Sequence, residues 1–350
     1  MISVVTRSTG SLLIALAGVG LFHLNDLPLP WLLGPIIACL IASLLGVRIS
    51  GFPRTNTSMR IVLGVALGAS LTPDLLSRMD AIGRSLLLVP PFMAVSAAIG
   101  FPYFRRFCGF DPATSFFAAM PGGLLDMLIF GQEAGGSLRM LSLVHATRLL
   151  MIVSALPFFL QYGLELDINQ PPGNPVSSLS FSQAGFMLCA GLLGWFLAVR
   201  IGLPGAALLG PMIAAGLASQ LGFITDRPPA EAILMAQLFV GLTIGVSYLG
   251  ITVRELRQII LAAIGYVLIL CVLSGLVVAV AIKLNNTAPL DAILAFSPGG
   301  QAEMAVLAIV AGADVAFVVT HHITRILTVT IGAPIVHRVL HTKSQKPSGN

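Results

Sequence analysis

Charged residues are scarce in this chain of 350 residues. Asp, Glu, Lys and Arg make up 9% of the sequence, whereas hydrophobic residues make up 56%. A soluble domain carries roughly 25% charged residues, so the composition excludes a soluble globular protein and predicts an integral membrane protein. Several uncharged runs approach the ~20 residues that cross ~30 Å of hydrocarbon as a helix. These runs are Leu27–Val47, Ser85–Phe104, Phe181–Val199, Ile201–Thr225, Ala232–Val253 and Gln258–Ile282. Barrel strands would alternate in polarity and be half as long, so the chain is predicted to be an all-α polytopic membrane protein.

Sequence motifs of several other protein classes are also missing. The four cysteines lie far apart without a C-x-x-C pair, which implies neither a disulfide framework nor a zinc site. There is no P-loop, H-E-x-x-H, G-x-S-x-G or strand-linked G-x-G-x-x-G, which disfavours an ATP-driven pump or a known hydrolase. The net charge of +5 comes from basic residues scattered at the ends of apolar runs. Such residues are topology signals rather than a nucleic-acid surface, and no metal or cofactor is implied.

The chain does contain a long internal repeat, offset by 176 to 177 residues. WLLGPIIACLIASLLG at 31–46 matches ALLGPMIAAGLASQLG at 207–222, and GVALGAS at 64–70 matches GLTIGVS at 241–247. Pro-Gly-Gly at 121–123 matches the same triplet at 298–300, and HATR at 145–148 matches HITR at 322–325. Chance similarity between apolar helices would not keep Pro, Gly, His and Arg in register. The repeat therefore predicts a duplicated membrane half.

The repeat and the arginine positions together predict the domains and the topology. The predicted parts are a first membrane repeat at 1–164, a periplasmic linker at 165–182, a second repeat at 183–340 and a polar cytoplasmic tail at 341–350. The linker contains acidic residues but no Lys or Arg, so we place it outside, whereas pairs such as Arg105 and Arg106 mark cytoplasmic ends. This charge distribution fits two inverted repeats, each of about five transmembrane helices plus one re-entrant or broken helix, with both termini cytoplasmic. Glycine-rich helix faces permit a homodimer.

The first apolar stretch resembles a secretory signal peptide in composition. It has a repeat partner near 183–203, however, and is therefore expected to be part of the fold.

Each Pro-Gly-Gly triplet is expected to break a helix near the middle of the membrane, because proline lacks a backbone N–H and glycine frees the dihedrals. A helix restarting after the triplet would direct its free N–H groups and positive dipole end at the break, which favours an anion. Matched breaks in two repeats are typical of a transporter site; the alternative is that they only kink helices for packing. The substrate-binding candidates are Pro121, Gly122, Gly123, Asp126, Arg148, Pro298, Gly299, Gly300, Gln301, Glu303 and Arg325.

Arg148 and Arg325 lie well inside apolar helices, where a lone arginine costs at least several kcal/mol. Asp126 and Glu303 precede them by the same spacing, so we predict the ion pairs Asp126–Arg148 and Glu303–Arg325. These pairs could be purely structural, or they could exchange partners with an anion or a proton.

The ion-coupling candidates are His145 and His322, which lie three residues before the arginines on the same helix face. The alternative for each is a buried histidine satisfied by a neighbour. His321 and His322 are adjacent, so their side chains should diverge on a helix.

With LLGP, GxxxGxS, an acid after Pro-Gly-Gly, and H-x-x-R in each half, the chain resembles the bacterial AbrB-like membrane protein family, also called the membrane AbrB duplication family. Members of that family carry labels such as ammonia monooxygenase and regulator of gene expression. A copper enzyme needs clustered ligands that six scattered histidines do not offer, so no enzymatic activity is expected. A regulator would act indirectly, since no soluble DNA-binding domain is present.

The function predicted from these features is secondary transport of a small organic anion across the bacterial inner membrane, coupled to H⁺ or Na⁺. The alternative is a membrane sensor or regulator of gene expression that does not transport, and a membrane monooxygenase is the least favoured.

Overall fold

The computed structural model describes residues 2–71, 79–203, 205–250 and 253–344, and every regular element in these ranges is helical, as the sequence predicts. The α-helices are α1 (Ile2–Leu24), α2 (Pro30–Leu44), α3 (Pro53–Ala69), α4 (Met79–Leu86), α5 (Val89–Pro102), α6 (Pro112–Ala119), α7 (Leu124–Glu133), α8 (Leu138–Phe158), α9 (Phe181–Arg200), α10 (Ala206–Gln220), α11 (Ala230–Val246), α12 (Val253–Asn285), α13 (Pro289–Phe296), α14 (Gln301–Val310) and α15 (Val315–Ser344). Short π-helical turns, Tyr103–Phe107 and Phe159–Gly163, extend α5 and α8, and a 3-10 turn spans Val176–Ser178. The predicted polar tail is helical as far as Ser344, and its remainder, 345–350, lies outside the described residues.

Within the described residues, six helical segments are long and apolar enough to cross a membrane. They are Arg7–Leu24, Ile82–Phe107, Leu138–Gly163, Phe181–Arg200, Ile259–Asn285 and Val315–His337. Their length and composition are those of an integral membrane protein.

Three uncharged runs give shorter helices than expected, because each run also contains apolar loop residues: at both ends for α2 and α10, and after the C-terminus for α11. The helices α2 and α10 contain 15 residues each, and α11 contains 17. Residues in the left-handed region precede both α2 and α10, namely Leu29 with φ 46° and Gly205 with φ 67°. Glycines with φ 77° and 78°, Gly46 and Gly222, follow their C-termini and stop both helices in the same way. The repeat thus extends to helix capping.

The chain forms two compact units, and each contains segments of both sequence repeats. Unit 1 comprises Met1–Met79, Ile152–Leu256 and Gly299–Val319. Unit 2 comprises Asp80–Met151, Arg257–Pro298 and Thr320–Asn350. The compact units therefore cut across the two halves defined by the repeat, and one boundary falls inside the second Pro-Gly-Gly triplet.

In unit 1, neighbouring helices of the same repeat meet at matched glycines. A methyl group at Gly18 on α1 would overlap the backbone of Gly34 on α2. Likewise, a methyl group at Gly194 on α9 would overlap the backbone of Gly210 on α10. Both glycine pairs allow the close backbone approach that is typical of packed membrane helices.

Unit 1 also joins the two repeats by reciprocal crossings, in which α3 packs on α10 and α11 packs on α2. The glycines of GxxxGxS face the LLGP helix of the other repeat: Gly64 abuts Leu208, and Gly241 abuts Leu32. These glycines serve contacts within the chain, and the expectation of a homodimer stays a prediction.

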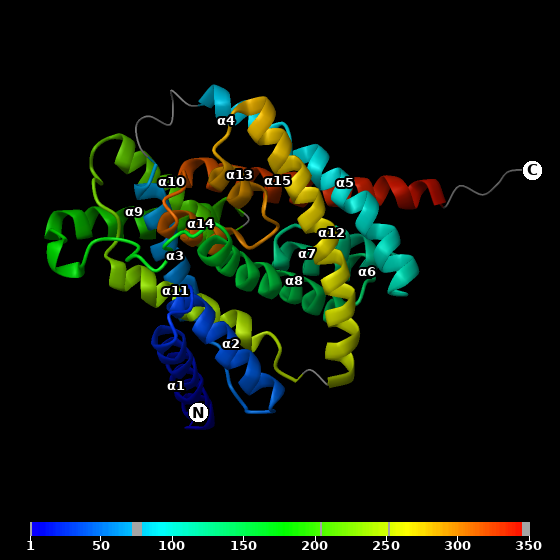
Figure 1. Ribbon diagram of the computed structural model, residues 1–350, viewed down its shortest axis with the longest axis horizontal. Helices are drawn as coiled ribbons and strands as arrows, with labels where there is room; N and C mark the ends of the chain where they lie inside the picture. The colour runs from blue at the N-terminus through cyan, green and yellow to red at the C-terminus, as the bar shows by residue number, and fades with distance from the viewer. Residues whose placement is uncertain (1, 72–78, 204, 251–252, 345–350) are drawn as a thin grey trace, which may run out of the picture. The chain divides into compact units, whose positions relative to one another are not determined.

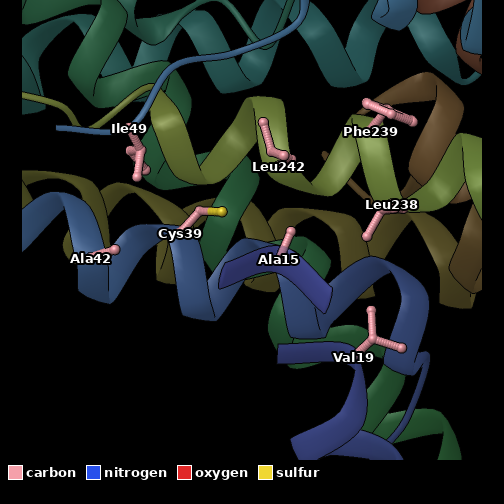
Figure 2. Packing of buried hydrophobic residues seen from close by; sticks show 8 residues of the cluster. All are labelled: Ala15, Val19, Cys39, Ala42, Ile49, Leu238, Phe239 and Leu242. Carbon is pink, nitrogen blue, oxygen red and sulfur yellow. The ribbon is translucent and has the colours of Figure 1, made fainter. Parts of the chain in front are cut away.

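A buried apolar cluster holds α1, α2 and α11 together in unit 1, where the three helices lie side by side (Figure 1). Figure 2 shows Ala15 of α1 beside Cys39 of α2, and Val19 of α1 below Leu238 of α11. Leu242 of α11 lies above Ala15 in the same view. Each fully buried Leu or Val contributes about 1.5–3 kcal/mol of hydrophobic stabilisation relative to exposure of the side chain to water. In a bilayer, the close fit of the side chains is the larger part of this gain.

Candidate functional site

Both Pro-Gly-Gly triplets break a helix, as the sequence predicts. Residues 120–123 are non-helical between α6 and α7, and residues 297–300 are non-helical between α13 and α14. Each following helix starts directly after the triplet, with Gly123 or Gly300 as an N-cap that offers no side-chain hydrogen bond. Asp126 and Glu303 lie in the first turns of α7 and α14. A break of this kind leaves the last carbonyl groups of α6 and α13 without helical partners.

In the first repeat, the side chains of α8 satisfy these carbonyl groups. His145 Nε2 donates a hydrogen bond to the Phe117 carbonyl oxygen at 3.1 Å. Arg148 donates from Nη1 to the Met120 carbonyl at 3.4 Å and from Nη2 to the Gly122 carbonyl at 3.3 Å. Both side chains are almost fully buried. The His and Arg side chains of the H-x-x-R motif therefore bind the backbone carbonyl groups of the broken segment.

The second repeat reproduces two of these hydrogen bonds on α15. His322 Nε2 donates to the Leu294 carbonyl at 3.0 Å, and Arg325 Nη1 donates to the Ser297 carbonyl at 2.9 Å. Donors and acceptors all lie 177 residues after their counterparts in the first repeat. The repeat is therefore structural at this site, since it preserves hydrogen-bond partners and not only residue types. Both histidines donate through Nε2 to a neighbouring carbonyl group, which fits the alternative of a buried histidine, and their ion-coupling role stays a prediction.

Helix α12 supplies a further hydrogen bond to each broken segment, which the sequence analysis missed. The Tyr266 hydroxyl hydrogen-bonds to the carbonyl of Ala119, the last residue of α6, and lies 3.3 Å from the Ser96 carbonyl oxygen. The Ser274 hydroxyl donates to the carbonyl of Phe296, the last residue of α13, at 2.9 Å. Ala119 and Phe296 are repeat equivalents, whereas Tyr266 and Ser274 come from one helix. Polar residues in the otherwise apolar α12 were the available signal.

The predicted ion pair between Asp126 and Arg148 is not formed in the described part of the chain. The Asp126 carboxylate instead accepts a hydrogen bond from the Thr330 hydroxyl of α15 at 3.1 Å. Arg148 is drawn to the Met120 and Gly122 carbonyl groups, because the break leaves those groups in need of donors. The other predicted pair, Glu303–Arg325, joins residues of different units and stays a prediction.

The guanidinium of Arg148 is consequently a buried charge without a carboxylate partner among the described residues. Its side chain is 4% exposed, and its Nε has no hydrogen-bond partner in the described part of the chain. Within the same limits, the Nδ1 atoms of His145 and His322 are also unpartnered. Neutral carbonyl groups stabilise a buried cation less than an anion does, so Arg148 is set up to attract one.

The other candidate residues occupy the second break and the helix after it. Pro298 ends its segment of unit 2, whereas Gly299, Gly300, Gln301 and Glu303 belong to unit 1, where Glu303 is buried in α14. The adjacent histidines diverge as predicted, since His321 Nε2 lies 2.9 Å from Ser85 Oγ and His322 contacts Leu294. No group of three His, Cys, Asp or Glu side chains in the described residues could hold a metal ion.

Known proteins resemble this chain over nearly its full length. The protein YhjN of Bacillus subtilis (strain 168), named "Uncharacterized protein YhjN", is 26% identical over 94% of this chain and 91% of its own length. The protein of Escherichia coli (strain K12) named "Putative regulator AbrB" is 25% identical over 92% of this chain and 93% of its own length. Residues 31–341 match the family described as "Transition state regulatory protein AbrB". Because this match spans both copies of the repeated motifs, the protein belongs to the AbrB family.

Proposed function

We propose that this protein is a secondary transporter that moves a small organic anion across the bacterial inner membrane, coupled to H⁺ or Na⁺. The observation that carries the proposal is Arg148, a buried guanidinium whose hydrogen-bond acceptors among the described residues are neutral carbonyl groups beside a broken helix. An anion next to Arg148 would neutralise this charge, and the uncapped N-terminus of α7 would add favourable N–H groups. Equivalent breaks in two repeats are the arrangement in which transporters bind substrates.

In this proposal the two repeats are inverted, each with about five crossings and one broken segment, and both termini lie in the cytoplasm. The 165–182 linker lies in the periplasm. Asp126, Glu303, His145 and His322 are the candidates for coupling. Asp126 is the best placed of these, because its only hydrogen-bond partner among the described residues, Thr330, belongs to the other repeat. The proposal includes no enzymatic activity and no nucleic-acid binding.

The alternative is a sensor that binds an anion and influences gene expression without transporting it. It is favoured by the name of the Escherichia coli relative and by the description of the family. The same Arg148 site would serve the sensor, so binding alone does not separate the two functions. Flux separates them, because a sensor reconstituted in liposomes should bind the anion without moving it.

The test uses purified protein screened by thermal shift against acetate, lactate, succinate, citrate and taurine. A ligand at ~100 times its dissociation constant adds ~2.7 kcal/mol of stability. Arg148→Gln removes the charge but keeps a shorter polar side chain with N–H donors, and Arg148→Lys keeps the charge. We expect the stabilising anion to lose its effect in Arg148→Gln and to keep part of it in Arg148→Lys.

The matched control is Arg200→Gln, since Arg200 is exposed at the end of α9 and stacks on Phe196. It removes the same charge elsewhere and should leave the thermal shift unchanged. If Arg148→Gln folds with normal stability and responds to anions like the wild type, Arg148 is a structural lock and the proposal fails. If an anion binds, its radiolabelled form is then tested for uptake into liposomes.

A further inference from the structure

Unit 1 contains a cavity of about 220 Å³ that is separate from the Arg148 site. It is bordered by the segment between α1 and α2, the 168–172 part of the linker, two residues of α11 and the last residue of α14. All of these segments belong to unit 1, whereas Arg148 belongs to unit 2. The volume is below the ~300–1,000 Å³ of drug-sized sites, so the cavity suits a small metabolite.

The most informative residue of the cavity wall is Gln237 on α11. Its side chain is 2% exposed, and its Nε2 has no hydrogen-bond partner in the part of the chain that the structure describes. A buried amide N–H group without an acceptor is costly, by about 1–3 kcal/mol. A bound molecule with an acceptor oxygen at this wall would remove that cost.

The cavity also carries a carboxylate and an aromatic ring. Asp26 is exposed, and no described residue pairs with its carboxylate. The indole of Trp31 and the apolar side chains of Leu27 and Ile168 line the same space. The linker fixes this rim, because Asn169 Oδ1 accepts a hydrogen bond from the Leu29 N–H at 3.1 Å and holds Leu29 in its left-handed conformation.

We propose that this cavity binds a small zwitterionic amine, of the class of apolar α-amino acids. The carboxylate of the ligand would accept from Gln237 Nε2, its ammonium would pair with Asp26, and its side chain would lie against Trp31. A simple anion fits less well because Asp26 would repel it, and a simple amine would leave Gln237 without an acceptor. This inference does not rest on the proposed transport function.

The experiment reads binding through the fluorescence of Trp31. The chain has two tryptophans, Trp31 and Trp195, so Trp195→Phe leaves Trp31 as the only reporter. The probes are L-leucine, 4-methylpentanoate, which lacks the ammonium, and isopentylamine, which lacks the carboxylate. We expect L-leucine to change the Trp31 emission saturably and the other two to bind at least tenfold more weakly.

Two variants in this background test the assigned contacts. Gln237→Leu and Asp26→Asn should each weaken L-leucine binding at least tenfold. Gln237→Leu should not lower the melting temperature of the free protein, because it removes an unpaired buried amide. Gln132→Leu, the same change at an exposed position of α7, should bind L-leucine normally. The proposal is overturned if no probe alters the emission, if 4-methylpentanoate binds as tightly as L-leucine, or if either cavity variant binds normally.

Discussion

Gly64 and Gly241 occupy equivalent crossings between the two repeats, and an added methyl group at either position tests whether those crossings are formed. A Cβ at Gly64 would overlap the Leu208 carbonyl and lie 2.9 Å from Pro211 Cβ. A Cβ at Gly241 would overlap the Leu32 carbonyl and lie 3.3 Å from Pro35 Cβ. Carbon atoms pack best at about 3.5–4.0 Å, so the contact at Gly64 is the tighter one.

A rotamer change cannot relieve this overlap, because the main obstacle is a backbone carbonyl group in the facing helix. The helices must separate instead, and a radial gap of about 0.5–1 Å already loses a quarter to a half of each van der Waals contact. We expect Gly64→Ala and Gly241→Ala each to destabilise the protein by about 1–3 kcal/mol. Gly64→Ala should be the more damaging of the two.

The assay is unfolding of the purified protein in mixed micelles as the SDS fraction is raised. Gly185→Ala is the matched control, because Gly185 lies inside α9 and an added Cβ meets no atom within 4 Å. Alanine favours a helix over glycine by about 0.8–1 kcal/mol, so this control should be unchanged or slightly more stable. If the variants at Gly64 and Gly241 unfold like Gly185→Ala, the reciprocal crossings are wrong.

Three other outcomes are expected. In a cysteine-free background, a membrane-impermeant maleimide should label Ser177→Cys, in the exposed linker, from the periplasm. The same reagent should label Arg54→Cys only from the cytoplasm. Labelling of both cysteines from one side would contradict the inverted topology. Thr330→Val should cost about 1.5–3 kcal/mol because it removes a hydrogen bond to the Asp126 carboxylate. Thr328→Val should cost less, since that hydroxyl donates to the neutral Thr324 carbonyl of its own helix. His145→Leu and His322→Leu should each destabilise the protein in the same detergent assay by about 0.5–1.5 kcal/mol, because each removes a hydrogen bond to a buried carbonyl group. An effect at only one site would contradict the structural equivalence.

The helix breaks were predictable from the sequence, because they depend on local backbone chemistry. Proline and glycine act on their own residue and its neighbours, so Pro121–Gly123 ends α6 whatever packs around it. The partner of Arg148 was not predictable in this way. Sequence reasoning pairs a buried charge with an opposite charge, and it selected Asp126. The carbonyl groups of Met120 and Gly122 do not appear in the sequence as polar residues, yet the break makes them the nearest unsatisfied acceptors.

Two other features could not follow from comparing the sequence with itself. Tyr266 and Ser274 serve both breaks from one helix, so they have no counterparts at the repeat offset to draw attention to them. The composition of the two units was also hidden, because Gly64 could pack within its own half or against the other half with the same residues. Only the three-dimensional contacts distinguish these arrangements.

The side chains at the breaks can have two roles: hydrogen bonding to the backbone and recognition of a charge. His145, Tyr266, Ser274 and His322 each satisfy one carbonyl group with a donor that needs no charge. A structural lock at Met120 and Gly122 could likewise be made by a neutral amide, which avoids the cost of burying a cation. The chain uses a guanidinium there, while the acid in the next helical turn bonds to Thr330 instead. A purely structural role accounts for the donors of Arg148 but not for its charge, and an anionic ligand accounts for both.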